Sequence, residues 1–232
     1  MCGRYVVKQG NRVWVQQSTE KIHPDPFRFL NREIDFGGTY NAAPTDKLPI
    51  YRISREGDAK LELFRWGLIP SWTKQLPRSK PLINARAETV AEKPSFRSAF
   101  ERRRCLVPMS GFYEWQLRPD GKQPYFIHLL NEDLFAAAGL WEWWPGQGQE
   151  AVFSFTIITF EPNDLVKNTH DRMPAILPLE HYETWLDPQN RDLTELQKLL
   201  RPYPADEMAA YPVSTQVNSV KNNSADLIEP IG

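Results

Sequence analysis

The sequence predicts an α+β fold in which a curled, mostly antiparallel and barrel-like β-sheet carries packed helices. Three observations favour this class. Apolar runs alternate with turn residues as far as Phe160, helical spacing of apolar residues is confined to short segments, and twenty prolines imply many fixed loops. With 232 residues and 41% hydrophobic content the chain can bury one sizeable core, so we expect a single domain over residues 1–232.

The strands are expected in successive hairpins, each marked by a turn rich in Gly, Pro or Asp. The expected strand pairs and their turns are 48–53 and 61–69 around Glu56-Gly57-Asp58, 104–115 and 124–130 around Arg118-Pro119-Asp120-Gly121-Lys122, and 134–143 and 151–160 around Pro145-Gly146-Gln147-Gly148. Helical spacing is found at 93–102, 179–186 and 193–200, where Pro188 and Pro202 mark ends.

Charge is balanced over the whole chain but uneven along it. The formal net charge of −1 argues against a protein that coats duplex DNA or an acidic membrane non-specifically. Between Lys74 and Arg104, however, nine basic residues face three acidic ones, a net of +6. This stretch fits either a solvated face balanced by acids elsewhere or a site for a polyanion.

Neither the cysteines nor the histidines indicate a disulfide framework or a metal site. Cys105 lies in an apolar run typical of a buried strand, and the four scattered histidines lack the spacing of metal ligands. The sequence shows no leader and no apolar run of about 18 residues. We therefore expect a cytoplasmic protein without metal, cofactor or membrane contact.

Cys2 directly follows the initiator Met1, so removal of one residue would leave a 1,2-aminothiol. An α-amine with a pKa of about 7.7–8.0 and a thiol with a pKa of about 8.5 can attack the same carbonyl carbon in turn. The first attack gives an imine and the second closes a five-membered thiazolidine ring. The alternative is a small residue at a frayed chain end.

Four short sequence segments contain polar or aromatic residues that core packing does not require. Asn84 ends an apolar tripeptide and either caps the chain or serves chemistry. Glu114 lies among aromatic residues in an expected strand, where burial would raise its pKa towards neutrality and exposure would leave an ordinary edge charge. His170 lies in a loop between Thr169 and Asp171, a better acid/base candidate than a strand histidine. Trp72 follows Pro-Ser at a loop tip, where an indole can stack on a base.

Seven strings in one order resemble the SRAP family, the SOS response-associated peptidases or abasic-site processing proteins. They are Met1-Cys2-Gly3-Arg4, Tyr40-Asn41-Ala42-Ala43-Pro44, Arg65-Trp66-Gly67-Leu68-Ile69-Pro70, Asn84-Ala85-Arg86-Ala87-Glu88-Thr89, Gly111-Phe112-Tyr113-Glu114-Trp115, His170-Asp171-Arg172-Met173-Pro174 and Val217-Asn218. The resemblance implies a protein that recognises abasic sites in single-stranded DNA and bonds covalently to them through the N-terminal cysteine.

The resemblance also implies roles for individual residues. The catalytic residues would be Cys2, Asn84, Glu114 and His170. Contacts to the DNA backbone would come from Arg4, Asn41, Arg86 and Arg172, and the wedge beside the lesion from Pro44, Trp66 and Trp72. The expected partner is single-stranded DNA with an abasic site, with replication-fork proteins as possible further partners, and the expected state is a monomer.

Two other functions use the same residues. An N-terminal nucleophile hydrolase or peptidase would attack an amide with the Cys2 thiol, its own amine serving as base, and removal of Met1 could be its only cleavage. A non-catalytic reader of modified DNA bases would depend on Trp66, Trp72 and the basic stretch. The three differ in product, because only the first leaves one denaturation-resistant adduct per protein.

Overall fold

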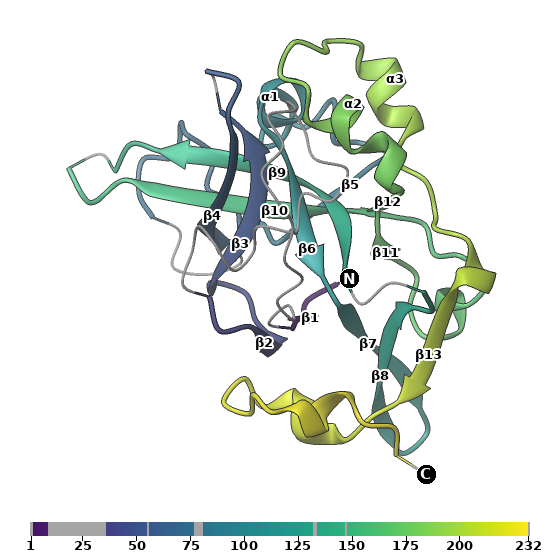
Figure 1. Cartoon of the computed structure of the whole chain (residues 1–232). Helices are drawn as coiled ribbons and strands as arrows, with labels where there is room; N and C mark the ends of the chain where they lie inside the picture. Colours follow the sequence, from purple (N-terminus) through teal and green to yellow (C-terminus); the bar gives the residue numbers. More distant parts are fainter. Residues whose placement is uncertain are drawn as a thin grey trace, which may run out of the picture.

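A closed ring of five strands forms the centre of the fold (Figure 1). The computed structural model describes residues 2–8, 36–54, 56–76, 81–131, 134–146 and 148–231. The ring runs in the order β10 (Val152–Phe160), β4 (Ala59–Trp66), β3 (Lys47–Ile53), β6 (Arg104–Met109) and β9 (Phe135–Trp144), and closes where β9 pairs with β10. The expected curled, barrel-like and mostly antiparallel sheet is confirmed.

Three short strands extend the barrel and carry site residues. They are β5 (Asn84–Arg86), β11 (Met173–Pro174) and β12 (Ile176–Leu177). Strand β5 runs parallel to β10 and places Asn84 opposite Ile157, while β11 pairs with the end of β10. Most strand pairs of the described residues are antiparallel. The exceptions are β4 and β5, which both run parallel to β10.

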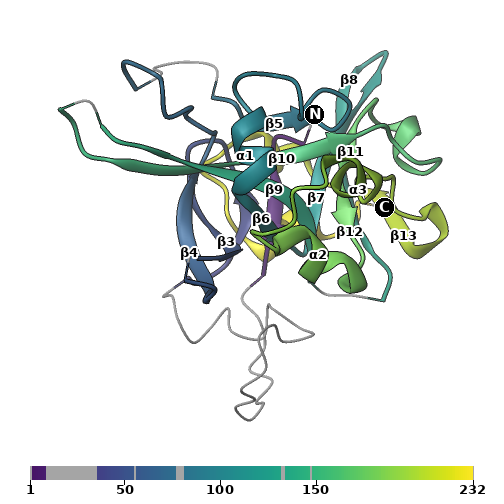
Figure 2. The ribbon, with the colours of Figure 1, turned by 90° about the horizontal axis from the view of Figure 1, so that it is seen from above.

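A second sheet lies beside the barrel. Its order is β13 (Met208–Pro212), β8 (Gly121–Leu129), β7 (Gly111–Arg118), β1 (Tyr5–Val7) and β2 (Thr39–Ala42). Figure 2 shows β1, in purple, running through the middle of the molecule. The pairing of β1 with β7 therefore brings the start of the chain into the interior.

The expected single strand over residues 104–115 is wrong in one respect, because it is two strands that belong to different sheets. The break falls at Ser110, whose backbone N–H donates to the Val6 carbonyl and whose hydroxyl accepts from the Lys8 backbone N–H. Pairing with β1 thus directs the chain from β6 of the barrel into β7 of the second sheet. The hairpins β3–β4, β7–β8 and β9–β10 pair as the turn residues predict.

The helices are short and cover one end of the barrel (Figure 1). They are α1 (Arg97–Arg102), α2 (Tyr182–Leu186) and α3 (Leu193–Lys198). Each is shorter than its helical pattern, because residues 93–96 form turns and residues 179–181 form a 3₁₀ turn. Asp192 caps α3 by accepting from the backbone N–H groups of Thr194 and Glu195.

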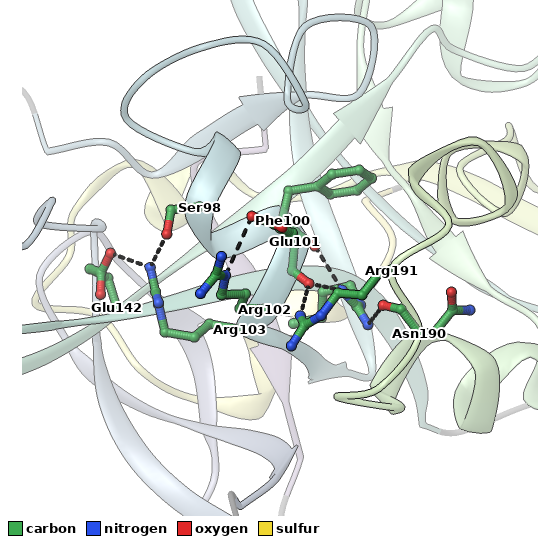
Figure 3. Close-up of polar contacts among 9 residues, drawn as sticks. Ser98, Phe100, Glu101, Arg102, Arg103, Glu142, Asn190 and Arg191 are labelled. Carbon is green, nitrogen blue, oxygen red and sulfur yellow. Dashed lines mark hydrogen bonds and ion pairs between the residues drawn. The ribbon is translucent and has the colours of Figure 1, made fainter.

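Arginine side chains join α1 to its neighbours. Arg103 contacts Glu142 at 2.8 Å and Ser98 at 3.1 Å, and Arg191 donates to the Glu101 carbonyl (Figure 3). Arg104 is 4% exposed and donates to backbone carbonyls only, those of Phe100, Glu101, Trp185, Asp187 and Asn190. These carbonyls follow or end α1 and α2, so one guanidinium satisfies the last turns of both helices.

Two hydrophobic clusters share the barrel wall. One lies between the barrel and the helices and includes Phe100 and Trp185. The other is formed by residues of all five ring strands together with residues of the second sheet, and includes Cys2, Tyr5 and Trp66. The chain therefore buries its second residue in a core rather than leaving it at a frayed end. Within the described residues, no helix is long and apolar enough to cross a membrane.

Candidate active site around Cys2

Cys2 is fully buried just ahead of β1. The Asn84 side-chain amide donates to the Cys2 backbone carbonyl at 2.8 Å, and the thiol lies 3.9 Å from the Arg4 carbonyl. Burial raises the pKa of the Cys2 thiol well above its usual range, and the Glu114 carboxylate adds to this shift. The thiol is therefore protonated at neutral pH in this state.

Glu114 points inward from β7 and is 2% exposed. Along β7 the side chains alternate, so Glu114 lies on the same face as Phe112, which packs in the Cys2 cluster. Burial raises the pKa of Glu114 to about 7. Of the two positions that the sequence leaves open for this carboxylate, the core position is the one observed. Near neutral pH, Glu114 can both give and accept a proton.

His170 lies opposite Glu114 with its Nε2 atom 3.9 Å from Glu114 Oε2. Its Nδ1 atom faces the Arg172 backbone N–H at 3.0 Å and Asp171 Oδ1 at 2.8 Å. Neutral Nδ1 accepts from the amide, whereas protonated Nδ1 donates to the carboxylate, so both charge states of the ring have a partner. Burial lowers the pKa of His170, and Asp171 opposes that shift.

Asn84 contributes an acceptor as well as a donor. Its Oδ1 atom is buried and has no hydrogen-bond partner among the described residues. A buried amide oxygen without a partner is costly, and a hydroxyl or ammonium group of a bound molecule would remove that cost. The same is true of the Tyr5 hydroxyl, which the sequence analysis did not single out. The sequence did contain a signal for this residue, because Tyr5 closely follows Cys2 in Cys2-Gly3-Arg4-Tyr5.

The structure thus brings together the four expected catalytic residues from separate parts of the chain. Asn84 contacts Cys2 directly, Glu114 acts on the Cys2 thiol through its charge, and His170 faces Glu114. They stand on β5, before β1, on β7 and in the loop before β11. Asp171 contacts His170 and Glu88 contacts Arg172 in the same neighbourhood, although neither carboxylate is among the site residues expected from the sequence.

Arg4 and Asn41 are engaged with the C-terminal segment. Arg4 donates to Asn41 Oδ1 at 2.8 Å and to the Val217 carbonyl at 2.9 Å. Asn41 is 4% exposed, and its amide donates to the carbonyls of Val217, Ser219 and Asn222. These contacts fasten the 3₁₀ turn Thr215–Asn218 against β2. The expected DNA contacts of both residues remain predictions.

Arg172 is held by an acidic partner. It is 8% exposed, makes a two-pronged ion pair with Glu88 at 2.7 and 2.9 Å and also donates to the Thr159 carbonyl. Burial alone would raise the pKa of Glu88, but the bonds and charge of Arg172 outweigh it and the pKa is lowered. The pair ties the His170 loop to the loop after β5, and so fixes His170 relative to Asn84.

The remaining expected DNA contacts differ in exposure. Arg86 is exposed at the end of β5, and Trp72 is 65% exposed in a loop. That loop is fastened below Trp72, because the Trp144 indole donates to the Thr73 carbonyl at 2.6 Å. Trp66 is fully buried, with its ring edge-on to Tyr5, and Pro44 is half-buried. Arg86 and Trp72 are therefore directly available to a ligand, and Trp66 supports the core behind them.

The sequence of the chain matches those of known proteins over nearly its whole length. The sequence model of the SOS response associated peptidase (SRAP) family matches residues 1–220. The chain is 42% identical over 231 residues to abasic site processing protein YoqW of Bacillus subtilis, covering 99% of each chain. It is 36% identical to abasic site processing protein HMCES of Gallus gallus, covering 86% of this chain and 68% of that one.

Solved structures show the same fold. An X-ray crystal structure of a protein from Bacteroides thetaiotaomicron superimposes with a TM-score of 0.72 at 31% identity, covering 83% of this chain and 85% of that chain. A protein from Bordetella bronchiseptica gives a TM-score of 0.73 at 24% identity and covers 92% of this chain and 100% of that chain. The match over nearly the whole sequence, together with the shared fold, shows that this chain belongs to the SRAP family.

Proposed function

We propose that this protein acts as a monomer on abasic sites in single-stranded DNA and bonds to them covalently through Cys2, after removal of Met1. Met1 lies outside the described residues. The observation that carries the proposal is the burial of Cys2 beside a carboxylate whose pKa is about 7. The names of the curated relatives, abasic site processing proteins, support the same substrate.

The first step is the opening of the sugar. An abasic deoxyribose interconverts between a closed hemiacetal and an open aldehyde, and only the aldehyde has an electrophilic C1′ atom. His170 is the proposed acid/base at the ring oxygen, because both of its charge states have a partner in Asp171 and Arg172. Arg86, which is exposed at the end of β5, is the proposed contact to a flanking phosphate, which would position the strand without reading its sequence.

The second step joins the protein to the aldehyde. The Cys2 amine adds to C1′ and gives a carbinolamine, and protonated Glu114 supplies the proton with which the hydroxyl leaves as water. The Cys2 sulfur then adds to the carbon of the protonated imine left by that loss of water, and the thiol proton passes to the Glu114 carboxylate, which restores the protonated acid. The product is a saturated thiazolidine ring. Asn84 holds the Cys2 carbonyl, and fixing reactants in register can supply several kcal/mol of the barrier.

Ring closure explains a protective function. An imine at C1′ withdraws electrons and promotes β-elimination of the 3′ phosphate, whereas the saturated ring does not. Closure by the thiol would therefore preserve the strand, and slow closure would favour lyase cleavage. The protonated thiol is less favourable for a cysteine peptidase, because peptide attack needs a thiolate. In the proposed crosslinking reaction the Cys2 amine attacks first, so that step needs no thiolate.

A denaturing gel tests the proposal. Wild-type protein mixed with a single-stranded oligonucleotide carrying one abasic site should give one heat-stable shifted band. Cys2→Ala should give no stable band, because the amine alone forms only a reversible imine. Because both variants keep the α-amine, Cys2→Ala and Cys2→Ser should each give a weaker band that appears only after reduction with borohydride. Wild-type crosslinking by Cys2→Ala, or turnover of a peptide substrate without an adduct, would contradict the assignment.

A further inference from the structure

A cavity whose lining does not include Cys2 lies against β8 and β13 (both visible beside the C-terminal segment in Figure 1). Its volume is about 320 Å³, near the lower limit of about 300 Å³ typical of ligand pockets. On β8, Phe126 and His128 line it, while Ile127 between them points to the other face and packs in the Cys2 cluster. A ligand in this cavity is therefore separated from Cys2 by the sheet.

One part of the cavity lining is a set of hydrogen-bond donors. Lys8, Ser110 and Asn131 line the cavity, and among the described residues no Asp or Glu does. The Ser110 oxygen accepts from the Lys8 backbone N–H, which leaves its hydroxyl hydrogen for a ligand. His128 Nδ1 lies 2.7 Å from the Leu129 carbonyl, to which it donates, so Nε2 of the neutral ring is an acceptor and His128 does not belong to this donor set. With a lysine ammonium beside them, these donors favour an anion.

The other part of the lining is a wall of aromatic rings. The rings of Phe126 and His128 are stacked, with centroids 5.6 Å apart and planes inclined by 20°. The Tyr211 ring stands edge-on to His128 at 5.7 Å. The Phe126 ring occupies the space in which a Cβ at position 111 would lie, so a residue without a Cβ, Gly111, is required there. Phe126 is 2% exposed and supports this wall, so a flat ligand ring can stack on the half-buried rings of His128 and Tyr211.

From this pairing of anion donors with an aromatic wall we infer that the cavity binds a nucleoside monophosphate unit, either a free nucleotide or one residue of a nucleic acid strand. Lys8 and Ser110 hold the phosphate, and the ring wall holds the base. The inference does not depend on the proposed chemistry of Cys2, because the two sites lie on opposite faces of β8.

Calorimetric titration with dAMP tests the inference. The full chain should bind dAMP saturably, and inorganic phosphate or deoxyadenosine alone should each bind at least about tenfold more weakly. Lys8→Gln and His128→Gln should each weaken dAMP binding by about tenfold or more, whereas Lys122→Gln, an exposed lysine on the same strand β8, should leave it unchanged. Lys8→Gln keeps the test valid even if His128→Gln lowers the melting temperature.

Further measurements identify the source of the ligand and separate the two proposals. If an intact single-stranded oligonucleotide displaces dAMP, the occupant is a nucleotide of a strand; if it does not, the occupant is a free nucleotide. Cys2→Ala should lose crosslinking and keep dAMP binding. Absence of saturable dAMP binding, equal affinity for phosphate alone, or equal weakening by Lys122→Gln would overturn the inference.

Discussion

At the scale of single residues, Glu114 is almost fully buried, and burial raises its pKa to about 7, so it can exchange a proton near neutral pH. Glu114→Gln preserves shape but cannot exchange a proton. We expect adduct formation to slow by about 10²–10⁴, the range for lost general acid/base catalysis. Gel-shift affinity for the abasic strand should stay near wild type. An unchanged crosslinking rate would remove Glu114 from the mechanism.

The same carboxyl group predicts a cost in stability. Its pKa is about 7 in the folded chain, above the ordinary value of 4.5, so the folded state holds the proton more tightly than the unfolded state. Stability should therefore fall as pH rises from the ordinary value through 7, by at most about 3 kcal/mol. Glu114→Gln should raise the melting temperature at pH 8 and leave it unchanged at pH 4. Equal shifts at both pH values would contradict the linkage.

At the scale of elements, the Arg104 side chain links the C-terminal end of α1 to that of α2. Its buried guanidinium has no salt-bridge partner among the described residues and donates to five backbone carbonyls. Arg104→Met would leave those carbonyls without a donor, and we expect a loss of about 3 kcal/mol or more in the free energy of unfolding. Chemical denaturation measures it. Arg102→Met, which alters an exposed neighbour, is the control and should change stability by less than about 0.5 kcal/mol.

Elements also show what the sequence can and cannot predict. Turns with Gly, Pro and Asp mark the hairpins, because those residues determine local backbone geometry. The break at Ser110 depends on β1, more than 100 residues earlier in the chain, and no local signal reports it. The ring of strands likewise needs the pairing of β4 with β10, which lie far apart in sequence.

The candidate site divides in the same way. Residue types with chemistry, such as Cys2 and His170, are visible as motifs. Their partners are not, because the ion pair of Arg172 with Glu88 joins residues 84 positions apart. An arginine in a motif therefore reads equally well as a DNA contact or as a structural tie, and only its surroundings separate the two.

At the scale of the whole molecule, the free N-terminus is the feature on which the proposed chemistry depends. A chain shown by mass spectrometry to carry one extra residue before Cys2 has an acylated nitrogen, which cannot form an imine. We expect such a protein to bind the abasic strand and to form no thiazolidine, although its thiol is intact. The wild-type rate in this variant would place the reacting nitrogen elsewhere, most simply on a lysine.

Long-range charge gives the last prediction. The chain carries a net charge of −1, yet Arg86 is exposed beside the site, whereas Arg4 and Arg172 are engaged inside the protein. If three to five cationic contacts neutralise phosphates, the log–log slope of affinity against salt should be roughly −2 to −3.5 on single strands. Removing one contact should reduce its magnitude by about 0.7.

Arg86→Gln should therefore flatten the salt dependence by that amount while leaving the melting temperature unchanged, because its side chain is exposed. Lys198→Gln on α3, also exposed, is the matched control and should leave the slope as it is. Arg172→Gln should instead lower the melting temperature, since it strands Glu88 without its partner. Equal slopes for Arg86→Gln and wild type would mean that the strand follows another path across the molecule, with the phosphates held by groups other than the exposed end of β5.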